Sequence, residues 1–213
     1  MKIETLEVSG FYPALHGMRN PMDSWAKSDT TWHTTEEMYP DEPFHTTIDF
    51  LTGDADHDLS MRLQSAGPEH CKHLRMIMAY ADITAPRYWW NEFDTYRAGV
   101  EKVSCSTMHK LMARPLTIDD FEHESIEIGV LEKVIDGINA DMEQYKKAET
   151  GKLLIWRGII QMLPQSYLQK RTVMMSYAAL RNIYRQREGH KLREWKQFRE
   201  WVETLPENWM IIE

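Results

Sequence analysis

The chain has 213 residues and a mass of 25.2 kDa, which is enough for one domain with a full hydrophobic core. A hydrophobic share of 42% and a charged share of 27% are typical of globular proteins and exclude a disordered or fibrous chain. The formal net charge of −8 argues against a general binder of DNA or RNA, while a nucleotide in a local basic pocket remains compatible with it. The apolar runs are too short for a membrane span, and the first ten residues lack the apolar core of a signal peptide. We therefore expect a cytoplasmic protein.

The first 55 residues are predicted to be extended and rich in turns. Lys2–Val8 and His45–Leu51 mix β-branched and apolar residues with polar ones, which is the pattern of partly exposed strands. Asn20-Pro21 disfavours a continued helix and predicts a loop between these strands. From Asp56 onward the pattern is predicted to turn helical.

Four helices are predicted in the C-terminal half of the chain. The clearest carries apolar residues at every third or fourth position, with charged residues on the opposite face. In chain order the helices are expected to span Ser125–Ala148, Thr150–Met162, Gln169–Arg187 and His190–Thr204. The sequence thus predicts a single α+β domain over residues 1–213, with an N-terminal β-rich part and a helical C-terminal half.

Histidines and cysteines form no strong metal or nucleophile motif. His70 and His73 stand one helical turn apart, but no third ligand follows at a fixed spacing, so we expect a hydrogen-bonded or solvated helix face. Glu122-His123-Glu124 has the same weakness and is expected to lie on the surface. Cys105 lacks a predicted base and is expected to be a small buried residue rather than a nucleophile. No metal site is predicted.

Two segments, Tyr88–Lys110 and Leu163–Trp195, carry a recognisable pattern. The second opens with Leu163-Pro164, after which polar residues follow at fixed spacings from the proline. These residues are Ser176, Asn182, Arg187, His190 and Glu194. The pattern resembles the flavin-dependent thymidylate synthases, the ThyX family, in which the corresponding helix carries Asn, Asn and Arg before a His.

The upstream segment keeps less of the family signature. Arg97 stands for one arginine of an Arg-His-Arg element, and Ser106 keeps the serine of the next element. Met108 replaces an arginine that helps to hold the nucleotide phosphate in the family. His109 and Lys110 are the nearby residues that we expect to supply replacement donors. Ile160 stands where the family usually has another arginine, and Arg157 is expected to substitute for it.

The resemblance implies an FAD-dependent enzyme that acts on a pyrimidine deoxynucleotide. In the family a reduced flavin lies against the uracil ring of dUMP, methylene-tetrahydrofolate donates one carbon and NADPH reduces the flavin. The family pattern assigns FAD binding to Arg97, Ser176, Asn182 and His190, and to His70, whose Pro68-Glu69-His70 setting is similar to a family Pro-x-Glu-His element. The loop around Gly17–Trp25 has the place of a flavin-contacting region.

The expected catalytic residues are Arg187 and Ser106, which the resemblance also places at the substrate with His109 and Arg157. An arginine at the position of Arg187 polarises the uracil ring and stabilises negative charge that develops on it. Family sites lie between the subunits of a homotetramer, so a homotetramer is expected, with neither a membrane nor a nucleic-acid polymer as partner. The alternative is a catalytically inactive protein of this fold that binds nucleotides or serves in an assembly, which the missing phosphate-binding arginines favour.

Overall fold

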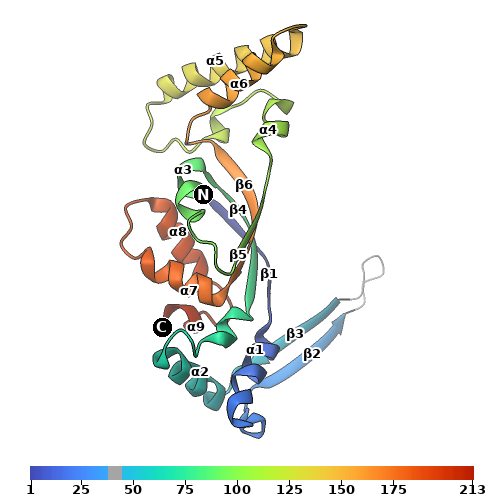
Figure 1. Ribbon diagram of the computed structural model, residues 1–213, viewed down its shortest axis with the longest axis vertical. Helices are drawn as coiled ribbons and strands as arrows, with labels where there is room; N and C mark the ends of the chain where they lie inside the picture. Colours follow the sequence, from blue (N-terminus) through green and yellow to red (C-terminus); the bar gives the residue numbers. More distant parts are fainter. Residues whose placement is uncertain (38–44) are drawn as a thin grey trace.

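A four-stranded antiparallel sheet forms the centre of the computed structural model (Figure 1). Its strands lie in the spatial order β1 (Lys2–Ser9), β4 (Met78–Pro86), β6 (Leu168–Ser176) and β5 (Val100–Ser104). The two central strands pair along their whole length, from Met78 opposite Ser176 to Pro86 opposite Leu168. The structure describes residues 1–37 and 45–213, and the side chains of 34–37, 45–48 and 109 lie outside this description.

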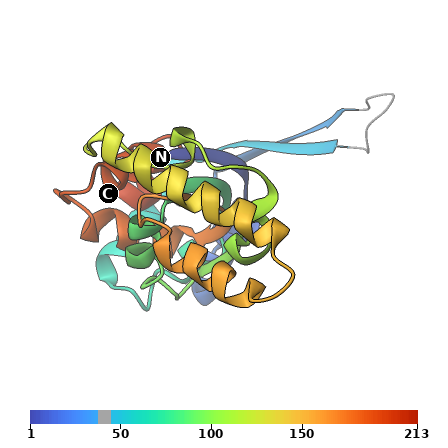
Figure 2. The same cartoon turned by 90° about the horizontal axis from the view of Figure 1, so that it is seen from above.

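Helices cover one face of the sheet and extend beyond one of its ends (Figures 1 and 2). The covering helices are α3 (Arg87–Phe93), α7 (Tyr177–Gln186) and α8 (Arg193–Val202), and the helices beyond the end are α5 (Ile128–Lys147) and α6 (Lys152–Met162). The other α-helices are α1 (Phe11–Met18), α2 (Asp54–Ala66), α4 (Thr107–Lys110) and α9 (Trp209–Ile212). Short 3₁₀ turns include η1 (Asn20–Met22), η2 (Trp25–Lys27) and η3 (Lys72–Arg75). None of the helices in the described part is long and apolar enough to cross a membrane.

Small side chains on the central strand leave room for large rings in the core. The alternation along β4 buries Ala79, Ala81, Ile83 and Ala85 completely, while most residues between them are partly exposed. The space beside these residues is filled by the fully buried rings of Trp89, Trp90, Phe93, Trp195 and Phe198. Trp89 contacts Trp195 with ring centroids 4.9 Å apart, which joins α3 to α8.

A second, smaller core lies under α5 and α6. The apolar stripe predicted for the longest helix is confirmed, because its residues Leu131, Ile135, Ile138 and Met142 are buried there. The helix begins at Ile128, three residues after the predicted Ser125, and Glu127 takes the cap position with no side-chain hydrogen bond. The second predicted helix is also confirmed, as Lys152–Met162.

The helix predicted over Gln169–Arg187 is wrong in its first half. Leu168–Ser176 is the central strand β6, and the helix starts only at Tyr177. Leu, Gln, Lys, Arg and Met favour helices when considered alone, but hydrogen bonding to strands on both sides overrides that preference. The expectation that the chain is helical from Asp56 onward fails for the same reason at β4 and β5, whereas α1 places a helix in the part predicted to be extended.

A two-stranded ribbon projects away from the body of the molecule (Figure 2). It consists of β2 (Thr31–Glu37) and β3 (His45–Leu51), and the bounds of β3 are those that the sequence predicts. Its base is anchored where Trp32 stacks on Phe50 at 4.8 Å and Phe50 contacts Phe11 at 4.7 Å. The predicted strand Lys2–Val8 is likewise confirmed as β1, one residue longer.

Candidate functional site

A groove of about 300 Å³ opens between helix α7 and the segment that runs from Pro68 to η3. Its lining residues are Pro68, Cys71, Leu74, Arg75, Ala178, Arg181, Asn182 and Arg185. Three of the eight are arginines and none is acidic, in a chain whose net charge is −8. The groove is therefore a local basic site with an apolar floor.

None of the three groove arginines forms an ion pair with an Asp or Glu side chain of the described residues. Arg75 Nη2 lies 3.3 Å from the Pro68 carbonyl oxygen, and Arg185 Nη2 lies 2.6 Å from the main-chain oxygen of Glu213. Arg181 Nη1 lies 3.9 Å from Cys71 Sγ, and its buried Nε has no hydrogen-bond partner among the described residues. Burial lowers the pKa of the Arg181 guanidinium, and the charge of Arg185 lowers it further.

A buried histidine lies behind the groove. His73 is 3% exposed, and its Nε2 lies 2.9 Å from the Ser60 hydroxyl. Burial lowers the pKa of His73 to about 4, and the charge of Arg181 also lowers it. His73 is therefore neutral at physiological pH, which agrees with the expected hydrogen-bonded role, while His70 is exposed beside Glu69.

Arg187 and His190 meet in a separate cluster just after the last residue of α7. Glu92 Oε2 lies 2.6 Å from Arg187 Nη1, 2.9 Å from Trp195 Nε1 and 3.3 Å from His190 Nε2. Arg187 Nε donates to the Tyr96 hydroxyl at 2.8 Å, and the guanidinium lies 4.2 Å from the Trp195 ring centroid. Leu192 N–H donates to His190 Nδ1, so the proton of the neutral ring sits on Nε2, facing Glu92.

The Arg187 cluster satisfies its charges within one chain. The Arg187 side chain is 15% exposed and carries an ion pair, a phenol contact and a stacked indole. Binding a uracil carbonyl through Nη1 therefore requires the Glu92 contact to be exchanged. The structure brings the predicted Arg187 and His190 together, with Glu92 as a partner that the sequence did not reveal.

Ser176 caps helix α7 rather than facing a ligand. Its hydroxyl accepts a hydrogen bond from Ala179 N–H at 3.2 Å, and the residue is 3% exposed. Gly99 packs directly against Ser176 and has a positive φ of 69°. A Cβ added at Gly99 would lie only 2.4 Å from Ser176 Oγ. Ser176 and Arg187 are the opposite caps of α7, and the Ser176 hydroxyl is already engaged by the helix.

Ser106 lies away from the groove in the same protomer. Cys105 N–H donates to the Lys170 carbonyl, and Lys170 is six positions before Ser176 on β6. At about 3.3 Å per strand residue, Ser106 is thus about 20 Å from the start of α7. Arg97 is exposed, and the side chain of His109 lies outside the described residues.

Arg157 belongs to the same end of the molecule as Ser106. It is exposed on α6, and α4 and α6 lie beyond the same end of the sheet (Figure 1). Met108 of α4 and Trp156 of α6 line one apolar hollow together. The substrate candidates Ser106 and Arg157 therefore lie at the opposite end of β6 from Asn182 and from the other substrate candidate, Arg187, and one protomer does not bring them together.

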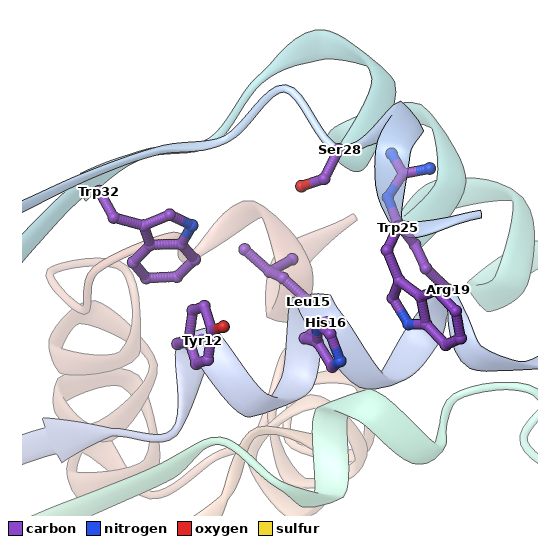
Figure 3. Close-up of a pocket in the computed structure, with 7 residues that line it drawn as sticks. All are labelled: Tyr12, Leu15, His16, Arg19, Trp25, Ser28 and Trp32. Carbon is purple, nitrogen blue, oxygen red and sulfur yellow. The ribbon is translucent and has the colours of Figure 1, made fainter. Parts of the chain in front are cut away.

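A second hollow, of about 40 Å³, has aromatic walls (Figure 3). It covers the segment expected to contact flavin, and its lining residues are Tyr12, Leu15, His16, Arg19, Trp25, Ser28 and Trp32. Arg19 Nε pairs with the fully buried Asp56 at 2.6 Å. Burial alone would raise the pKa of Asp56, but hydrogen bonds from Ser28, Thr30 and Arg19 lower it below its usual value. The hollow is thus charge-neutral, unlike the groove.

The described residues offer no group of three or more His, Cys, Asp or Glu side chains arranged to hold a metal ion. Cys105 is exposed, so the expectation of a buried thiol is wrong for that residue, whereas Cys71 is buried. The reason is that Cys105 follows the last residue of the edge strand β5, past the helices that cover the sheet.

No protein-family model matches the chain, and no curated protein matches it in sequence. The fold is similar to crystal structures of flavin-dependent thymidylate synthase ThyX from Helicobacter pylori, solved with FAD and dUMP. Two such structures give TM-scores of 0.71, at 15% and 14% identity, over 100% of this chain and 98% of theirs. The similarity shows the fold alone: the α+β single-domain architecture implied by the resemblance is confirmed.

Sequence reasoning missed the groove arginines and Glu92. Arg181 and Arg185 are four residues apart and share one face of α7, as they also do in the predicted helix over Gln169–Arg187. The sequence did not show that this face borders a groove. Arg75 had no sequence signal, because only the packing of η3 beside α7 brings it to the groove.

Proposed function

We propose that this chain binds FAD and dUMP and transfers a one-carbon unit from methylene-tetrahydrofolate to the uracil ring, with NADPH as reductant. The observation that carries the proposal is the basic groove beside Asn182, a residue that the family resemblance assigns to FAD, in a chain with the ThyX fold over its full length. Bound FAD supplies the redox chemistry that side chains lack.

The groove residues fit a flavin dinucleotide in their donor chemistry. Asn182 can donate to and accept from a ring edge, and the Nε of Arg181 is a buried donor without a partner among the described residues. Leu74 and Ala178 supply apolar surface against which a planar ring can pack. Four of the predicted FAD residues remain candidates, namely His70, Arg97, Asn182 and His190, whereas Ser176 is occupied as a helix cap.

In this proposal, Arg187 stabilises charge on the uracil ring after exchanging its contact with Glu92. The planar guanidinium then donates to a carbonyl oxygen, and the stack on Trp195 holds its plane. Arg187→Lys keeps the charge and loses the fork, so we expect dUMP affinity to fall by about 1–3 kcal/mol. Calorimetric titration with dUMP measures this loss of affinity. Arg193→Lys, outside the groove and the Arg187 cluster, is the control. Equal losses in the two variants would contradict a role of Arg187 in dUMP binding.

We propose a homotetramer because the candidate residues lie at the two ends of β6. Ser106 and Arg157 lie too far from the groove to share a ligand with Asn182 in one protomer, so a neighbouring copy has to supply them. Light scattering at micromolar concentration tests this arrangement, and a stable 25 kDa particle would contradict it.

Flavin reconstitution tests the enzyme directly. The purified protein is soaked in excess FAD, desalted and examined for flavin absorbance and a thermal shift, then incubated with dUMP, methylene-tetrahydrofolate and NADPH. We expect bound flavin and formation of dTMP, detected by mass spectrometry. Absence of both bound flavin and a thermal shift would sink the proposal.

A second candidate is a nucleotide-binding protein of this fold without transferase activity. The internal ion pair between Arg187 and Glu92 favours it, because that pair occupies the guanidinium expected to act on uracil. Flavin binding without dTMP formation would select this candidate.

A further inference from the structure

Three arginines converge on the groove, and its lining contains no acidic side chain. Five of the ten arginines outside the groove form an ion pair with an Asp or Glu side chain, and the other five form none among the described residues. The paired ones are Arg19, Arg114, Arg171, Arg187 and Arg193. Arg75, Arg181 and Arg185 form no such pair within 4 Å among the described residues. In a chain with an excess of acids, three arginines without an acidic side chain as partner converge on one groove.

Two of these charges are held close together at a cost to stability. Arg181 and Arg185 are four residues apart on α7, a spacing at which like charges repel. Arg181 is half-buried, and its Nε has lost water without gaining a partner in the described chain. A bound anion would remove both penalties at once.

The walls of the groove define the shape of that anion. Arg75 comes from η3 on one wall, Arg181 and Arg185 come from α7 on the other, and Asn182 lies between them in the sequence of α7. Guanidinium forks match phosphate oxygens in pairs, so donors on two walls suit a group with several oxygens and at least two charges. About 300 Å³ holds such a group and leaves room for part of a ring system.

We infer that Arg75, Arg181 and Arg185 form the phosphate subsite of the groove and bind the pyrophosphate group of a dinucleotide. This inference rests on the proposed function for the identity of the dinucleotide, while the pyrophosphate chemistry rests on the groove itself. The subsite is distinct from the Arg187 cluster, whose guanidinium is already paired.

The test compares ligands that share or lack the charged group. Calorimetric titrations with FAD, ADP, inorganic pyrophosphate and riboflavin are run on the full chain and on Arg75→Gln, Arg181→Gln and Arg185→Gln. Each substitution is expected to weaken FAD, ADP and pyrophosphate about tenfold to a hundredfold, the range for a charge-assisted hydrogen bond, and to leave riboflavin unchanged. Arg193→Gln, an exposed arginine outside the groove, removes the same charge and is the matched control.

The outcomes separate this inference from the proposed function. Pyrophosphate and ADP binding that depends on the three arginines, without FAD binding, supports the phosphate subsite and contradicts the flavin enzyme. FAD binding that is unchanged in all three variants overturns the phosphate subsite and leaves the flavin proposal standing. Absence of pyrophosphate binding by the unmodified chain also overturns the subsite.

Stability gives an independent readout without any ligand. Because Arg181 has no acidic partner in the described chain, Arg181→Gln is expected to keep or raise the melting temperature of the free protein. A lower melting temperature would assign Arg181 a structural role instead. The exposed Arg75 and Arg185 keep the binding test independent of this result.

Discussion

Helix α7 brings arginines to two regions that treat the guanidinium in opposite ways. In the Arg187 cluster, Glu92, Tyr96 and Trp195 surround one guanidinium and neutralise it. In the groove, Arg181 and Arg185 face Arg75, and none of the three has an Asp or Glu side chain as ion-pair partner among the described residues. The comparison teaches that an arginine is available to a ligand only when no partner in the chain already occupies its guanidinium. Spacing in the sequence alone therefore does not identify a binding arginine.

The largest effect on stability is expected when the negative charge of Glu92 is removed from the Arg187 cluster. Glu92→Gln keeps the shape of the side chain but leaves Arg187, which is 15% exposed, without a compensating charge. We expect the free energy of unfolding to fall by about 2–3 kcal/mol, below the value for a fully buried pair because Glu92 is 35% exposed. Urea denaturation at neutral pH measures this change. An unchanged midpoint would show that Glu92 does not stabilise the folded chain through Arg187.

Behind the groove, His73 is expected to make the stability of the folded chain depend on pH. The pKa of His73 is lowered to about 4 from an ordinary 6.5, so the unfolded chain takes up the proton first as the pH falls. This contribution to stability is complete above pH 6.5, declines by up to about 1.4 kcal/mol per unit toward pH 4, and is lost below it. His73→Gln should flatten that slope in denaturation series between pH 7 and 4, while the exposed His57→Gln should not.

Ser176 lies at the start of α7, the helix that contributes residues to the groove and to the Arg187 cluster. Ser176→Ala removes the N-cap hydroxyl of α7 and should cost about 1 kcal/mol in the free energy of unfolding. Since the residue is buried as a cap, FAD affinity is expected to stay unchanged. A selective loss of FAD affinity at constant stability would instead restore the ligand-binding role that the sequence predicts.

The smallest effect is expected at an exposed ion pair. Arg193 and Glu124 are both about 60% exposed, so water and salt screen their charges. Glu124→Gln should leave the denaturation midpoint unchanged within error, in contrast to Glu92→Gln. Similar losses in the two variants would mean that burial does not distinguish the two pairs.

Local patterns in the sequence determined several elements without help from the rest of the chain. The stripe of α5 repeats every three or four residues, because that period places its apolar residues on one helix face. The mixture of β-branched and apolar with polar residues in β1 and β3 marks partly exposed strands. The resemblance built on residues after Leu163-Pro164 also predicted the overall fold, since spacing along a helix and its flanking turns survives when individual side chains change.

Only the tertiary structure decided what the candidate residues do. Leu168–Ser176 has helix-favouring side chains and became a strand because β4 and β5 bind it on both sides. Glu92 reaches Arg187 across 95 positions of sequence, and Arg75 reaches the groove through the packing of η3 beside α7. Spacing along a chain fixes which residues share a helix face, but the partner that neutralises a charge is set by segments distant in sequence, whose contacts form only when the chain folds.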